Sequence, residues 1–346
     1  MTRSRRFVFS FVILLVVSSC GKKEDVIEET NAPAAPQKPS GPKKKVLYID
    51  SYHQGYGWSD GITSGVLKEL NATLTATGDA DSSSSAYTLR IHRMDTKRNN
   101  TPEFIEKAGQ DAKKLIDSWM PDVVIAADDN ASKHIIEKYY KNSATPFVFC
   151  GLNWDETIYG FPCSNVTGMI EVALVPDMVK TLTPFAKGKR LGFLGPDNET
   201  SRKEAEYFGK KYGLVLDSRF VKNFADWKVQ YKSLQTDCDI LFVDNNAGIA
   251  GWVDMEAEHY VKTETQVPSA SIYDFMAPFA LVTYAKVASE QGQWAAKTAK
   301  EILAGKAPSE ISVGVNKEAQ IFLNMGLAEK LGITFPVDLM ERSVIR

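Results

Sequence analysis

The residues best suited to binding a ligand lie in one short segment with the sequence SYHQGYGW. Ser51, Tyr52, His53, Tyr56 and Trp58 place three aromatic rings, a hydroxyl and an imidazole within eight positions. Exposed aromatic rings stack on planar or apolar groups, and their polar atoms form hydrogen bonds. Because so many aromatic residues are unusual in a simple connection, we expect this segment to bind a small ligand. The alternative is that the rings pack against the backbone of their own loop.

A second group of polar residues follows later apolar runs in the chain. We predict that six of them face the same ligand: Asp129, Asn130, Asn153, Asn245, Asn246 and Asp274. A carboxylate of this group can pair with a ligand ammonium, and Trp58 can add cation–π attraction. The amides suit a carboxylate or hydroxyl groups. This mixture favours an amino acid, aromatic or otherwise, or another amine-bearing ligand. A sugar is the alternative ligand, and helix capping is the alternative role of the acidic residues.

Catalysis and metal binding find little support in the sequence. A hydrolase built from Ser51, His53 and Asp129 would lack the GxSxG motif, and its serine and histidine lie two residues apart on one loop. The four histidines are scattered, and neither CxxC nor HExxH occurs. We therefore expect no enzyme activity, no metal site and no cofactor.

Apolar runs that predict strands alternate with helical patterns along most of the chain. In the first half these runs are residues 46–49, 87–94, 122–127 and 146–150. Such alternation is typical of right-handed βαβ units with a parallel sheet. Ligands bind beyond the carboxyl ends of the strands in such sheets. The aromatic segment, residues 128–130 and residues 153–154 all follow strands, so they should meet at one edge.

The strand and helix pattern restarts after residue 165 and predicts a second lobe. The fold class is therefore α/β, with two Rossmann-like lobes, parallel central sheets and several chain crossings between them. We expect the first lobe to contain residues 44–160 and about 280–310. We expect the second lobe to contain about 165–275, with about 311–346 as a tail that packs across the hinge.

The N-terminus has the pattern of an exported lipoprotein. Residues 1–20 join three arginines, an apolar run and the sequence VSSC, as in a signal peptide with a lipidation site at Cys20. Residues 21–43 are polar and rich in proline and lysine, as in a disordered tether. An ordinary signal peptide with an incidental cysteine is the alternative. We expect a location in the cell envelope, on the periplasmic face of the outer membrane if the cell has two membranes.

Two further features limit the partners and the redox chemistry. The formal net charge of −2 gives no basis for binding nucleic acid. Cys150 and Cys163 are close enough in sequence to form a disulfide in an exported protein, or they are free buried thiols.

Four stretches resemble one known family. They are SYHQGYGWSDG (residues 51–61), PFVFCGLN (146–153), NVTGMIE (165–171) and NMGLAEKLGITFP (324–336). In this order they resemble the substrate-binding proteins of ABC transporters, in the tryptophan/tyrosine-binding-like group with the type I periplasmic binding protein fold. The resemblance implies two lobes, a hinge of three crossings and a small ligand trapped between the lobes. It also implies an ABC permease as the membrane partner.

The first of these stretches, together with Asp128–Ala131, also resembles versions of this module that act as extracytoplasmic sensor domains. No transmembrane segment or kinase segment follows the module in this sequence, which is unlike those sensors. A ligand sensor or scavenger that signals to a membrane protein is therefore the alternative to a transport protein.

Overall fold

The computed structural model describes residues 42–346, and Pro42–Arg346 form one compact unit. The predicted signal peptide, Cys20 and nearly all of the predicted tether lie outside the described residues. Within residues 42–346, no helix has the length and hydrophobicity needed to cross a bilayer.

The first lobe is built on a six-stranded sheet in which every neighbouring pair of strands is parallel. In spatial order its strands are β4 (Tyr87–Arg93), β1 (Lys44–Asp50), β5 (Val123–Ala127), β6 (Phe147–Asn153), β7 (Val166–Glu171) and β13 (Gly314–Val315). A separate hairpin pairs β2 (Thr73–Leu74) with β3 (Ala80–Asp81). The helical segments of this lobe are α1 (Gly57–Leu70), α2 (Pro102–Trp119), α3 (Asp128–Ala131), η1 (Ser132–Tyr140), η2 (Glu156–Tyr159), α8 (Ala288–Leu303) and η5 (Pro308–Glu310).

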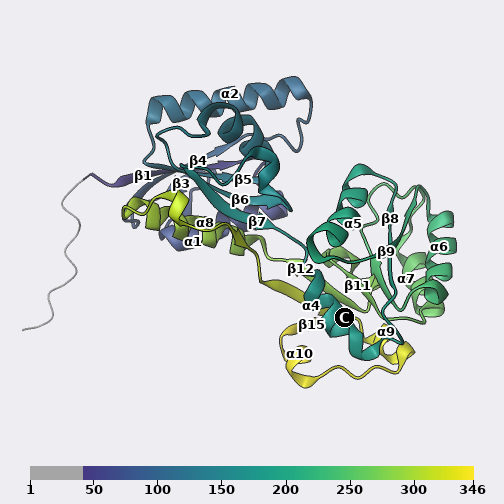
Figure 1. The fold of residues 1–346 in the computed structure, drawn as a ribbon. Helices are drawn as coiled ribbons and strands as arrows, with labels where there is room; N and C mark the ends of the chain where they lie inside the picture. The colour runs from purple at the N-terminus through teal and green to yellow at the C-terminus, as the bar shows by residue number, and fades with distance from the viewer. Residues whose placement is uncertain (1–41) are drawn as a thin grey trace, which may run out of the picture. The chain divides into compact units, whose positions relative to one another are not determined.

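Helices cover both faces of this sheet, which explains why the central strands β5 and β6 are buried along nearly their whole length (Figure 1). Along β1, Leu47 and Ile49 join the core shared with α2, whereas Val46 and Tyr48 join the core shared with α1 and α8. Successive side chains of a strand point to opposite faces, so one short run supplies both cores.

The second lobe is built on a seven-stranded sheet. In spatial order its strands are β9 (Leu216–Val221), β8 (Leu191–Pro196), β10 (Ile240–Val243), β11 (Ser269–Ser271), β12 (Val282–Lys286), β14 (Ala319–Leu323) and β15 (Ser343–Ile345). Only the β12–β14 pair is antiparallel. The helical segments are α4 (Val175–Leu182), η3 (Thr183–Phe185), α5 (Glu199–Tyr212), α6 (Phe224–Asp237), α7 (Asp254–Glu264), η4 (Asp274–Phe279), α9 (Met325–Leu331) and α10 (Val337–Glu341).

The chain crosses between the lobes three times: between β7 and α4, between β12 and α8, and between β13 and β14. The predicted fold class, with its three-crossing hinge, is therefore confirmed. The expected lobe boundaries are wrong at three strands. β7 and β13 pair in the first sheet, and β12 pairs in the second. Apolar patterning predicts that a strand exists, but its pairing partner depends on contacts far away in sequence.

Helix α1 begins within the aromatic segment. Its first residue is Gly57, and its N-cap is Tyr56, which makes no side-chain capping bond. Ser59 lies inside the helix, where its hydroxyl donates to Asp50 Oδ1 at 2.8 Å. Trp58 is thus held on the first turn of a helix and not on a free loop.

Glycines allow α1 and α8 to approach closely. A Cβ at Gly65 would overlap the carbonyl oxygen of Ser289, and a Cβ at Gly292 would overlap the carbonyl oxygen of Ile62. These atoms belong to helix backbones and cannot move aside alone. The contact fixes the helix that bears Trp58 against the helix that follows the second crossing.

We expect Gly292→Ala to lower the free energy of unfolding by about 2 kcal/mol or more, because overpacking forces the two helices apart. Urea denaturation measures this change. Gly57→Ala is the matched control, since a Cβ there meets no atom within 4 Å. It should be neutral or slightly stabilising. Equal stabilities for the two variants would contradict the close contact.

Candidate functional site

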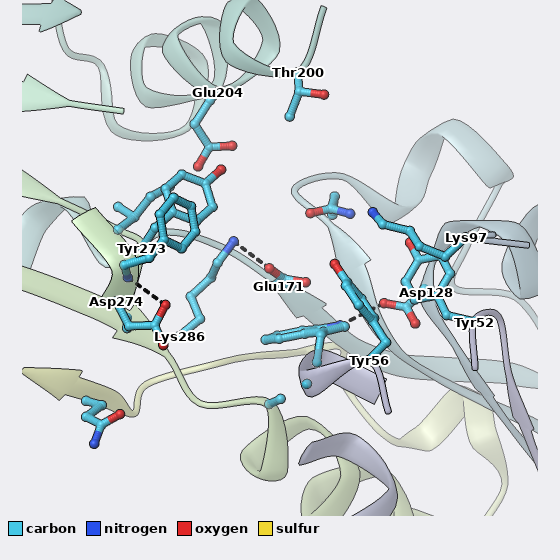
Figure 2. A pocket seen from close by; sticks show the side chains of 18 residues that line it. Tyr52, Tyr56, Lys97, Asp128, Glu171, Thr200, Glu204, Tyr273, Asp274 and Lys286 are labelled. Atoms are coloured by element: carbon cyan, nitrogen blue, oxygen red, sulfur yellow. Dashed lines mark hydrogen bonds and ion pairs between the residues drawn. The ribbon is translucent and has the colours of Figure 1, made fainter. Parts of the chain in front are cut away.

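A cavity of about 620 Å³, called the cleft below, is lined by residues of both lobes (Figure 2). Tyr52, Tyr56 and Trp58 contribute aromatic surface from the first lobe, and Tyr273 and Phe275 contribute it from the second. The volume falls within the range of small-molecule pockets.

The aromatic wall of the first lobe is held by the end of β1. Asp50, fully buried, accepts hydrogen bonds at Oδ1 from the Tyr52 backbone amide at 2.9 Å and from the Ser59 hydroxyl. The Tyr52 and Tyr56 rings meet edge to face with centroids 5.4 Å apart. The Lys97 ammonium lies 5.2 Å from each ring centroid. The wall is therefore positioned by a buried carboxylate rather than by packing on its own loop alone.

Asp128 lines the cleft beside this wall. It directly follows β5, is 2% exposed and has the left-handed φ of 70°. Its Oδ1 accepts a hydrogen bond from Trp58 Nε1 at 2.8 Å, whereas its buried Oδ2 has no partner among the described residues. Burial, with the nearby charges of Glu171 and Asp50, raises the pKa of Asp128 well above its ordinary value. A ligand ammonium would favour the ionised form.

Gly151 leaves the room that this arrangement needs. It follows Cys150 on β6 with a φ of 66°, and a Cβ there would lie 2.9 Å from Asp128 Oδ1 and 3.4 Å from Trp58 Nε1. A larger residue would press on the bonded pair as well as strain the backbone.

Glu204 of helix α5 is the corresponding carboxylate of the second lobe. It is 6% exposed, and its Oε2 accepts a hydrogen bond from Trp154 Nε1 at 3.0 Å. Its buried Oε1 has no partner within residues 42–346. Burial raises the pKa of Glu204 to about 7, although the Lys286 ammonium opposes the shift. Trp154 is held in turn by Tyr207, whose ring stacks on it at 5.4 Å.

A buried ion pair lines the cleft at the strand ends where the first two crossings begin. Lys286 at the end of β12 pairs with Glu171 at the end of β7 (Figure 2). Burial alone would lower the pKa of Lys286, but the carboxylates of Glu171, Glu204 and Asp244 outweigh burial and raise it. The Lys286 ammonium therefore stays protonated, and the Glu171 carboxylate balances its charge.

Five of the eleven residues predicted to bind ligand line the cleft: Tyr52, Tyr56, Trp58, Asn153 and Asp274. The structure places the other six outside its lining: Ser51, His53, Asp129, Asn130, Asn245 and Asn246.

Internal contacts account for most of the residues outside the lining. Ser51 Oγ donates to the Ala127 carbonyl and accepts from the Ala131 amide, so it joins strand ends. Asp129 accepts from Asn153 Nδ2 at 2.7 Å and from Tyr159. These side chains bond to neighbouring strand ends and helical segments of the first lobe and do not line the cleft.

Three more of these residues are held by contacts within their own lobe: Asn130, Asn245 and Asn246. Asn130 donates to Thr96 at 2.8 Å, and Asn245 donates to Asp244 at 3.0 Å. Asn246 uses its backbone carbonyl to accept from the Ile249 amide. The position of these residues after strands correctly predicts that they lie at the sheet edge. It does not predict whether their side chains face the cleft.

The hydrolase arrangement is not formed. His53 Nδ1 lies 3.6 Å from the Asp95 carboxylate, while Ser51 bonds to backbone atoms. Within the described residues, no cluster of three or more potential ligands could hold a metal ion. Cys150, Cys163 and Cys238 are free thiols.

Sequence reasoning missed five charged lining residues: Lys97, Asp128, Glu171, Glu204 and Lys286. Asp128 directly follows strand β5 and precedes Asp129. That position at the strand end is the feature of the sequence that indicates a lining residue. Glu204 lies within a helix of the other lobe, where its spacing resembles that of any charged surface residue.

The family model of ABC transporter substrate binding proteins matches residues 88–344. The chain therefore belongs to this family, which confirms the resemblance found in the sequence and implies an extracytoplasmic location. No protein among the curated ones matches.

Solved structures agree on the fold. CD0873 of Clostridium difficile, a substrate binding protein with adhesive properties in a ligand-free, open form, is 17% identical with a TM-score of 0.64. That match covers 88% of this chain and 99% of the other. An ABC domain from Streptococcus pneumonia in complex with L-Trp is 18% identical with a TM-score of 0.52, covering 88% and 100%. A Bradyrhizobium solute binding protein with bound Bis-Tris is 14% identical, with a TM-score of 0.51 and coverages of 83% and 84%.

Proposed function

We propose that this chain is a lipid-anchored, extracytoplasmic solute-binding protein that traps an amine-bearing small molecule between its lobes and delivers it to an ABC importer. One observation supports this ligand class above all. Asp128 and Glu204 belong to different lobes, line one cleft, and each has a buried carboxylate oxygen without a partner among residues 42–346. A buried unpaired carboxylate is costly, and a ligand ammonium relieves that cost in both lobes.

The aromatic side chains favour a ligand with apolar or planar surface. Trp58, Tyr52 and Tyr56 adjoin Asp128, so a cation there can also face ring surfaces. An aromatic or other amino acid fits this description, and the relative crystallised with L-Trp supports that candidate. Contacts made to both lobes only when the lobes close would shift the population toward the closed form.

A second candidate function is a ligand sensor or scavenger that signals to a membrane partner without transport. Tyr52, Tyr56, Trp58 and Asp128, which lie in the stretches that resemble sensor modules, all line the cleft. Loss of ligand uptake on deletion of the gene favours the importer, whereas unchanged uptake with an altered response to the ligand favours the sensor.

Native mass spectrometry of the protein purified without denaturant tests the proposed function. We expect a co-purified small molecule with at least one amine. Added back at a hundredfold excess over its dissociation constant, it should stabilise the fold by about 2.7 kcal/mol. A protein that stays ligand-free, and whose melting temperature ignores amino acids and amines, would contradict the proposal.

A further inference from the structure

The charges that line the cleft are unbalanced toward the negative. Four carboxylates line it, those of Asp128, Glu171, Glu204 and Asp274, against the ammonium groups of Lys97 and Lys286. Lys286 is already paired with Glu171. Asp244, a buried residue of the second lobe outside this lining, adds a further carboxylate whose Oδ1 has no partner in the described part of the chain.

Asp128 and Glu204, which each have one oxygen without a partner among residues 42–346, occupy similar surroundings in their separate lobes. Asp128 adjoins the Tyr52 and Tyr56 pair, and its charge contributes, after burial, to a raised pKa of Tyr52. Glu204 adjoins Tyr273, whose ring stacks on Phe275 at 5.3 Å, and its charge contributes in the same way to a raised pKa of Tyr273. Each lobe therefore offers one buried carboxylate beside one pair of aromatic rings, the combination that binds an organic cation. The first pair already has the Lys97 ammonium 5.2 Å from each ring centroid.

We propose that the ligand carries two protonated nitrogens, one held by Asp128 and the aromatic pair of the first lobe, the other by Glu204 and the aromatic pair of the second. This inference rests on the proposed function and narrows its ligand class to diamines and basic amino acids. A zwitterion with a neutral side chain brings one ammonium and one carboxylate, so it leaves one of the two carboxylates unpaired. A dication pairs both.

A second cation also explains how a ligand would favour closure. A monoamine bound to Asp128 contacts the first lobe through its charge and gains no ionic contact when the second lobe approaches. A dication gains the contact with Glu204 only when the second lobe closes over it. Its affinity is therefore higher for the closed form than for the open form, and this difference shifts the equilibrium toward closure.

Calorimetric titration of the purified protein tests the inference with α,ω-diamines of three to eight carbons, the matching n-alkylamines, L-lysine and L-tryptophan. We expect at least one diamine to bind about tenfold or more tightly than its matching monoamine, as expected for one additional charge pair. Glu204→Gln should abolish that preference. The matched control Glu206→Gln changes an exposed glutamate of the same helix, paired with Lys210, and should keep it.

The outcomes separate the inference from the proposed function. Diamines no tighter than their monoamines, or a preference that survives in Glu204→Gln, would overturn the inference. If L-tryptophan binds and the diamines do not, the proposed function stands and the inference fails. If no amine or amino acid binds, both fail. Melting temperatures show that each variant is folded before its titration is interpreted.

Discussion

Asp128→Asn is expected to weaken binding of the amine ligand about 100-fold, which corresponds to about 2.7 kcal/mol. The asparagine oxygen can still accept the bond from Trp58 Nε1 that Asp128 Oδ1 accepts now. The substitution therefore removes the charge and preserves the shape of the wall. Calorimetric titration with the co-purified ligand measures the loss.

Although Asp128→Asn should weaken ligand binding, it should not lower the stability of the ligand-free protein and should raise it if anything. Because burial raises the pKa of Asp128, its ionised form is costly in the ligand-free protein, and an uncharged amide removes that cost. We expect a melting temperature equal to or higher than that of the parent protein. Asp111→Asn, at an exposed site on α2, is the control and should leave affinity unchanged. Weak binding together with a lowered melting temperature would indicate misfolding instead of a lost charge pair.

Glu204→Gln is expected to stabilise the ligand-free protein at high pH and to have little effect at low pH. The pKa of Glu204 rises from an ordinary 4.5 to about 7 in the fold, so the folded state binds the proton more tightly than the unfolded state does. The free energy of unfolding must then fall as the pH rises through this window. The shift corresponds to at most about 3 kcal/mol above the window.

Urea denaturation at about pH 5 and about pH 8 measures this linkage. The variant should exceed the parent protein by about 2 to 3 kcal/mol at the higher pH and by less than about 1 kcal/mol at the lower pH. Glu206→Gln again serves as the control, because that glutamate is exposed. A difference independent of pH would show that Glu204 titrates normally and would remove one support of the cation site.

Local patterns predicted the framework of the fold well. The apolar runs of β1, β5 and β6 lie between two helical layers, so their composition alone indicated buried parallel strands. The lobe boundaries could not be predicted in the same way. β7 pairs with β6 and not with the second sheet, and that choice depends on a register between distant segments.

The first-lobe half of the site was predictable because its residues follow one another in sequence. Tyr52, Tyr56 and Trp58 belong to one strand-to-helix connection, whose position at a sheet edge follows from the βαβ pattern. The second-lobe half was less so. Glu204 lies on helix α5 and reaches the cleft beside Trp154, a residue fifty positions earlier. A contact over that distance in sequence leaves no local pattern. The sequence predicts Asp129 and not Asp128 in the site, because the left-handed backbone angle of Asp128, which sets the side-chain direction after β5, leaves no pattern in the sequence.

The most direct test of the account is a crystal structure of the protein with its co-purified ligand. We predict a ligand enclosed between the lobes, with a nitrogen within hydrogen-bond distance of Asp128 and contacts to Glu204 or Tyr273 across the cleft. A ligand that contacts only one lobe, or that binds outside the cavity lined by Trp58 and Lys286, would contradict the central claim.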